Sequence, residues 1–62
     1  MKIIYRDKEW EFPGRTTVRD AIKKIGLQPG AVLPLRDGQL ITDDVIAENG
    51  DTIRLIAVVS GG

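Results

Sequence analysis

The sequence contains no cysteine and no histidine. Without cysteine the chain can form no disulfide, and without both residues it can build neither a zinc site of the Cys/His type nor a histidine-based acid–base pair. A chain with no disulfide carries no sign of an oxidising compartment, so we expect a cytoplasmic protein.

An excess of one charge and a long apolar run are also missing. Nine lysine and arginine residues balance nine aspartate and glutamate residues. No basic stripe is present, so we expect no direct contact with nucleic acid. The N-terminus lacks the apolar centre of a signal peptide, and no run approaches the roughly 20 apolar residues of a membrane span. Sixty-two residues make one small domain, which we expect to be a monomer when alone.

Two short β-rich segments open the chain. Residues 2–6 and 9–12 are separated by a turn, and the second segment alternates charged and aromatic residues. Such alternation is typical of a half-buried strand, so the two segments predict a β-hairpin. We expect its buried face to carry Ile3, Tyr5, Trp10 and Phe12.

The next segment has the signals of one helix. Thr17 and Asp20 have the spacing of a capping box, in which Thr17 accepts from an amide three residues on and Asp20 reaches back. Gly26 can adopt the left-handed backbone conformation that ends many helices. Leu27 follows it and can make the apolar contact with the last turn that often accompanies such an end. The apolar positions fall on one helical stripe: Val18, Ala21, Ile22 and Ile25.

The second half of the chain predicts three strands. Residues 31–36 form one strand, and Pro34 favours a sheet edge for it because proline cannot donate to a ladder. A tight turn leads into a short strand at 39–41, and the polar segment 42–49 predicts a single helical turn. Residues 51–59 are apolar enough for a central strand with neighbours on both sides.

The order strand, strand, helix, strand, short strand, strand predicts an α+β fold. A right-handed crossover places the helix across one face of the sheet, with the first and last strands paired in the middle. That architecture is the β-grasp, a mixed four- to five-stranded sheet wrapped around one helix. We expect the domain to span residues 1–59 and residues 60–62 to form a flexible tail.

The sequence ends in Ser60-Gly61-Gly62, directly after the last predicted strand. Glycine has no Cβ and accepts both signs of φ, so such a tail is thin and flexible enough to enter a narrow channel. We therefore expect the reactive group to be the Gly62 carboxylate, which the chain presents to another enzyme.

Alternation along the last strand separates two faces. Ile53, Leu55 and Ala57 fall on one face, and Arg54, Ile56 and Val58 on the other. If the first set faces the helix, then Ile56 and Val58, together with Val59, form an apolar cluster at the root of the tail. Clusters of this kind dock partner proteins.

Other candidate sites have structural explanations. Asp43 and Asp44 are adjacent on an extended segment and point apart, so we expect solvated loop charges and no metal site. The internal glycines are scattered singly at turns and do not form a phosphate-binding loop. We therefore expect no catalytic side chain in this protein.

The chain resembles the sulfur-carrier and ubiquitin-like families of the β-grasp fold. These include the thiamine-pathway sulfur carrier, the small subunit of molybdopterin synthase, the carriers of tRNA 2-thiolation and the archaeal small modifier proteins. The resemblance covers the whole chain. It is carried by the opening strand Met1 to Tyr5, by Thr17-Val18, by Gly50-Asp51-Thr52-Ile53-Arg54-Leu55 and by the terminal Gly61-Gly62.

The resemblance implies a mechanism in which this chain is a co-substrate. An E1-like adenylyltransferase adenylates the Gly62 carboxylate, and a persulfide from a sulfurtransferase converts it to a thiocarboxylate. A downstream enzyme then accepts the sulfur in thiamine, tRNA 2-thiouridine or molybdopterin biosynthesis. ATP and Mg²⁺ are bound by the partner, and the carrier itself binds no cofactor. Gly61 gives a thin approach, Ser60 and Val59 line the channel entrance, and Ile56 and Val58 dock the partner.

Two alternatives remain open at this point. The same acyl adenylate could lead to an isopeptide between Gly62 and target lysines, which would make the chain a ubiquitin-like protein modifier. A third reading is a non-conjugated β-grasp binding module.

Overall fold

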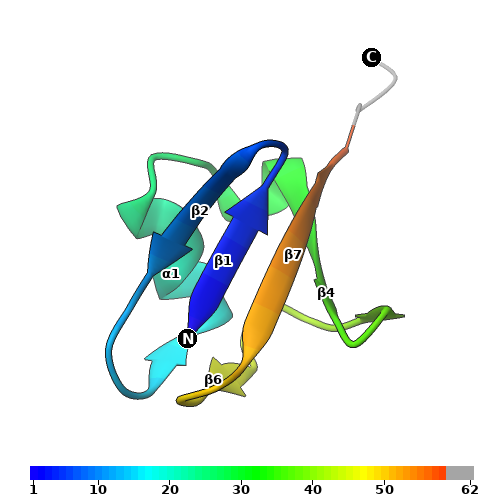
Figure 1. Cartoon of the computed structure of the whole chain (residues 1–62). Helices are drawn as coiled ribbons and strands as arrows, with labels where there is room; N and C mark the ends of the chain where they lie inside the picture. Colours follow the sequence, from blue (N-terminus) through cyan, green and yellow to red (C-terminus); the bar gives the residue numbers. More distant parts are fainter. Residues whose placement is uncertain (59–62) are drawn as a thin grey trace.

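The computed structural model describes residues 1–58 and contains a five-stranded sheet in the order β2-β1-β7-β4-β5 (Figure 1). The strands are β1 (Lys2–Tyr5), β2 (Lys8–Glu11), β4 (Val32–Arg36), β5 (Gln39–Leu40) and β7 (Thr52–Ala57). The pair β1–β7 is parallel and the other pairs are antiparallel. The predicted α+β fold is confirmed, with the first and last strands of this sheet paired at its centre.

One helix, α1 (Val18–Lys24), covers one face of the sheet. Its stripe packs on inward residues of β1 and β7, and Tyr5, Trp10 and Phe12 are partly buried against the same core, on the face that was predicted. No helix within residues 1–58 has the length and apolar character needed to span a membrane. Nine residues form the buried core: Met1, Ile3, Val18, Ala21, Ile22, Val32, Ala47, Ile53 and Leu55.

Both ends of α1 follow the local sequence signals. The Asp20 amide donates to the Thr17 hydroxyl at 3.3 Å, which is the expected cap. At the other end Gly26 has φ +91°, its amide donates to the Lys23 carbonyl, and the Leu27 amide donates to the Ile22 carbonyl. These two bonds form a Schellman motif, which satisfies carbonyls that the helix end would otherwise leave unpaired.

Replacement of Gly26 by alanine is expected to destabilise the fold by about 1–2 kcal/mol, because a side chain at positive φ is strained. No atom within 4 Å would clash with the added Cβ, so the cost comes from the backbone. The matched control is Gly30→Ala, which meets equally open space without a positive φ. Urea unfolding of both variants measures the difference. Equal midpoints for the two variants would contradict this account of the helix end.

The predicted edge position of Pro34 is wrong, because β4 lies between β7 and β5. The reason is the short length of β5, which pairs only with Leu35 and Arg36. Pro34 lies opposite Leu55, and its carbonyl accepts from the Ile41 amide on the side away from β7. Proline has no backbone N–H, but the nitrogen of Pro34 faces the region beyond the end of β5. No hydrogen bond of the sheet is therefore lost at this position.

The predicted helical turn at 42–49 is also wrong. Part of this segment forms β6 (Ile46–Ala47), which pairs antiparallel with β3 (Thr16–Thr17) in a second, two-stranded sheet. The Val18 amide also donates to the Val45 carbonyl at 2.9 Å. Backbone groups of this segment thus form hydrogen bonds with residues at the start of α1. A short 3₁₀ helix, η1 (Pro29–Ala31), precedes β4, so the strand begins at Val32, one residue later than predicted.

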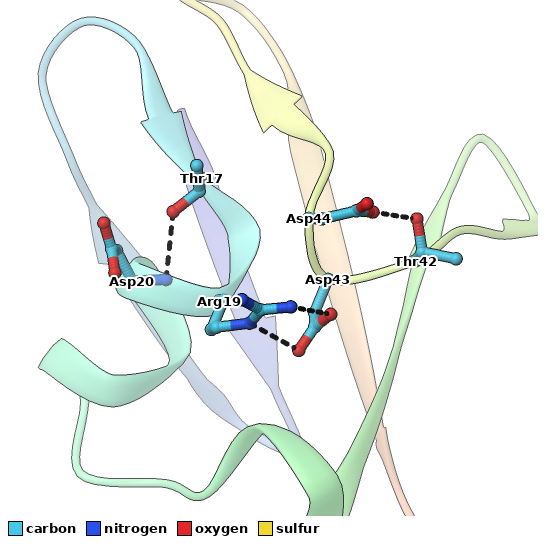
Figure 2. Close-up of polar contacts among 6 residues, drawn as sticks. All are labelled: Thr17, Arg19, Asp20, Thr42, Asp43 and Asp44. Atoms are coloured by element: carbon cyan, nitrogen blue, oxygen red, sulfur yellow. Dashed lines mark hydrogen bonds and ion pairs between the residues drawn. The ribbon is translucent and has the colours of Figure 1, made fainter.

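An ion pair between Arg19 and Asp43 joins the 42–44 loop to α1 (Figure 2). The Arg19 guanidinium donates to both carboxylate oxygens of Asp43 at 3.1 Å, and the Arg19 amide donates to the Asp43 carbonyl at 2.8 Å. Asp44 instead accepts from the Thr42 hydroxyl. The two carboxylates have separate partners, so they share no site, as expected. Asp43, however, is half-buried in an ion pair and is not a free loop charge.

The ion pair between Arg19 and Asp43 should make the stability of the fold depend on pH. The hydrogen bond from Arg19 lowers the pKa of Asp43. A carboxyl whose pKa is depressed in the folded state contributes stability above its unfolded-state pKa and loses it as pH falls through its folded-state pKa. We expect Asp43→Asn to lower the melting temperature at neutral pH, and the gap to wild type to close on acidification. The control Asp44→Asn lacks the arginine partner, so a gap that persisted at low pH, or appeared equally in the control, would contradict this assignment.

Candidate functional site at the C-terminal end of the sheet

The central strand β7 carries the chain toward its C-terminus. It is bonded to β1 on one side and to β4 on the other. Beyond the strand, the Val58 amide donates to the Ala31 carbonyl of η1 at 2.9 Å. Because β1 and β7 are parallel, the C-terminal end of β1 and the β1–β2 turn lie at the same end of the sheet as Val58 (Figure 1). The last described residues are therefore fixed by a rigid sheet.

The sheet face opposite α1 carries exposed aliphatic side chains. Ile56 is 47% exposed and lies directly opposite Leu33, which is 42% exposed. Val58 is 40% exposed, two residues after Ile56. Leu40 of β5, 61% exposed, lies opposite Leu35 on the same face. We call Leu33, Leu40, Ile56 and Val58 the outer apolar surface. Clustered exposure of this kind marks an interaction site, whereas single exposed aliphatic residues do not.

The sequence predicted part of this surface. Ile56 and Val58 face outward as expected, and Ile53 and Leu55 face the core. Ala57 was expected on the helix side but is exposed, since it lies at the end of the strand beyond the core. Leu33 and Leu40 were missed as site residues. Leu33 lies between Val32 and Pro34, which are both buried. Because successive side chains of a strand point to opposite faces, its position in the predicted strand could have indicated that Leu33 faces outward.

The remaining predicted site residues lie outside the described part of the chain. These are Val59, Ser60, Gly61 and Gly62, together with the predicted boundary between residues 59 and 60. Within residues 1–58 no polar or charged residue is buried. The described region therefore offers an exposed surface for binding and no enclosed polar site.

Comparison with known proteins gives two findings. The model of the ThiS family matches residues 1–62. The chain is also 29% identical over 65 residues to "Sulfur carrier protein TtuB" of Thermus thermophilus, and the match covers all of this chain and all of that protein. The family match spans every element described above and includes the C-terminal glycines.

Proposed function

Because the chain belongs to the ThiS family, we propose that it is a sulfur carrier that delivers sulfur as a thiocarboxylate on Gly62. The observation that carries this proposal is the family match over residues 1–62. The printed name of the Thermus relative, a sulfur carrier protein, supports it further. The carrier acts as a co-substrate and contributes no catalytic side chain.

The proposed chemistry begins with activation of a poor electrophile. An E1-like adenylyltransferase directs a Gly62 carboxylate oxygen to the α-phosphorus of ATP, and pyrophosphate leaves. The terminal sulfur of a persulfide then attacks the acyl carbon, and the bond to AMP breaks. A thiolate then attacks the sulfur of the resulting acyl disulfide that is not bonded to the acyl carbon; a new disulfide forms and the Gly62 thiocarboxylate is the leaving group. ATP and Mg²⁺ belong to the partner in this scheme.

The described surface has a role in this scheme. The outer apolar surface, which includes Ile56 and Val58, docks the adenylating enzyme. Because β7 is fixed on both sides, docking there sets the starting point and direction of the C-terminal residues. Val59 and Ser60 then line the entrance of the channel to the active site of that enzyme. Gly61 fits in the channel because it has no side chain.

The proposed partners follow from the reaction steps. They are the adenylyltransferase, a sulfurtransferase that provides the persulfide, and an acceptor enzyme of thiamine, tRNA 2-thiouridine or molybdopterin biosynthesis. We place these reactions in the cytoplasm.

The test is the intact mass of the protein isolated from its native cells without reducing agent. We expect a species heavier by the exchange of one oxygen for one sulfur, and fragmentation should place the change at Gly62. Lysine-linked adducts with only a free carboxylate would instead favour the protein modifier. A free carboxylate with no adducts, under sulfur limitation and under stress, would overturn both and leave a binding module.

A further inference from the structure

The β1–β2 turn carries an arginine in a conformation that favours glycine. Arg6 has φ 57°, and among residues 1–58 only Asp37 is another non-glycine residue with positive φ. A long side chain at such a position is strained, and strain of this kind is concentrated at functional sites. The fold keeps an arginine where glycine would be easier to accommodate. The backbone of the turn therefore does not itself call for an arginine at this position.

Arg6 is one of the residues that line a cavity of about 350 Å³. Its guanidinium carbon is 5.3 Å from the centroid of the Tyr5 ring. Tyr5 and Trp10 form the aromatic wall, and Ile25 and Leu27 at the end of α1 form the aliphatic wall. This volume is within the range of small ligand sites and is ample for one or two side chains of a partner.

The position of the cavity connects it to the C-terminus. Tyr5 is the last residue of β1 and pairs with Leu55 of β7, three residues before Val58. A partner bound at this end of the sheet is therefore close to the β1–β2 turn as well. The cavity lies on the helix side of the sheet, because Tyr5, Trp10 and Leu27 pack against the core. It is thus distinct from the outer apolar surface on the opposite side.

The charge at the cavity is positive. Arg6 and Lys8 line it with one acidic residue, Asp7. Neither cation forms an ion pair within residues 1–58, whereas Lys2, Arg15, Arg19 and Arg36 each have an acidic partner there. From residue 21 to residue 36 the sequence contains no acidic residue, so the helix end adds no negative charge. The cavity complements a carboxylate beside an apolar side chain.

We propose that this cavity is a second recognition site, which binds an acidic side chain and its apolar neighbour on the enzyme that adenylates Gly62. The proposal rests on the proposed sulfur-carrier function. Arg6 pairs with the acidic group, and the aromatic wall receives the apolar side chain. Contact on both faces of the sheet fixes the direction of the C-terminal residues better than one face alone. Arg6 is a docking residue, and it takes no part in the chemical step.

The first test compares Arg6→Gly with Asp37→Gly. Both variants place glycine at a turn position with positive φ. Asp37 is in the β4–β5 turn and does not line the cavity, so Asp37→Gly is the matched control. Relief of strain and the added chain entropy oppose each other, so we expect both melting temperatures to stay within about 5 °C of wild type. Carrier-dependent ATP–pyrophosphate exchange, with the adenylating enzyme of the same organism, measures function.

We expect Arg6→Gly to raise the KM for the carrier roughly 5- to 10-fold, with little change in kcat, as for loss of an interfacial charge pair. Arg6→Glu keeps the strained backbone and should raise KM further, with a weaker rise at high salt. Asp37→Gly should leave KM unchanged. An unchanged KM in Arg6→Gly, or equal changes in the two glycine variants, would overturn the proposal.

The second test detects occupancy of the cavity directly. Trp10 is the single tryptophan in the sequence, so 5-fluorotryptophan gives one ¹⁹F signal. We expect the adenylating enzyme to shift this signal for wild type and to shift it less for Arg6→Glu at a matched bound fraction. A signal that does not move on binding would overturn the proposal. A shift caused by ATP alone would do the same, since the cavity would then be a nucleotide site.

The two tests separate this proposal from the one it rests on. If wild type supports no carrier-dependent exchange, the proposed function fails. If wild type supports exchange and Arg6→Gly behaves identically, only the second recognition site fails.

Discussion

Deletion of Gly61 and Gly62 is expected to abolish sulfur transfer and leave the fold intact. The new terminal carboxylate would lie up to about 7 Å short of the old one, since each residue spans at most about 3.5 Å. A misplacement of about 1 Å already costs roughly 100-fold in rate, so the truncated chain should support no detectable exchange. The fold should survive because β7 ends at Ala57.

The measurement pairs carrier-dependent ATP–pyrophosphate exchange with the melting temperature of the same samples. Addition of one alanine after Gly62 is the matched control, since it keeps every native residue and only displaces the carboxylate. It should be inactive as well. Exchange by the truncated chain at the wild-type rate would show that the terminal carboxylate is not the group adenylated.

Alanine at Ile53 and at Ile56 should separate folding from binding on a single strand. Ile53 is fully buried, and loss of a buried isoleucine side chain costs about 2–5 kcal/mol. A domain of this size has a total stability of roughly 3–9 kcal/mol, so Ile53→Ala should lose a large fraction of its free energy of unfolding. Ile56 is 47% exposed, so Ile56→Ala should cost less than about 1 kcal/mol of stability.

At a temperature where both variants are folded, the effects on binding should run in the opposite order. If Ile56 is at the centre of the docking interface, its truncation should weaken affinity for the adenylating enzyme roughly tenfold or more. Urea unfolding and isothermal titration of the two variants provide the comparison. An Ile53→Ala variant as stable as wild type would contradict the assigned core. An Ile56→Ala variant that bound normally would remove the outer apolar surface from the interface.

Elements with local signals could be predicted from the sequence. The 18, 21, 22, 25 stripe, the Thr17 cap and Gly26 act within a few residues of each other, and α1 begins and ends accordingly. The second half of the capping box has no counterpart, because no hydrogen bond from the Thr17 amide to Asp20 is present among the described contacts. The density of apolar residues in 53–58 likewise indicated a central strand, and β7 has neighbours on both sides.

Elements that depend on distant partners could not be predicted. β3 and β6 have two residues each, which is too short for any periodic pattern, and they form only because the chain returns to the start of α1. The bond between Arg19 and Asp43 joins residues 24 positions apart. Arg6 was missed for another reason, since no sequence signal gives the sign of φ for an arginine. Its position beside an aromatic cavity needed the three-dimensional structure.

The parallel pairing of β1 with β7 also determines when the protein can fold. Lys2 lies beside Thr52, so the centre of the sheet closes a loop of about 50 residues. Contacts this far apart in sequence slow folding, because the entropy of loop closure is lost before the contacts form. During synthesis β1 leaves the ribosome well before its partner β7 does. A folded core can therefore exist only after β7 has been made, and a nascent chain that stops short of β7 would leave Ile3 and Val18 open to aggregation or proteolysis.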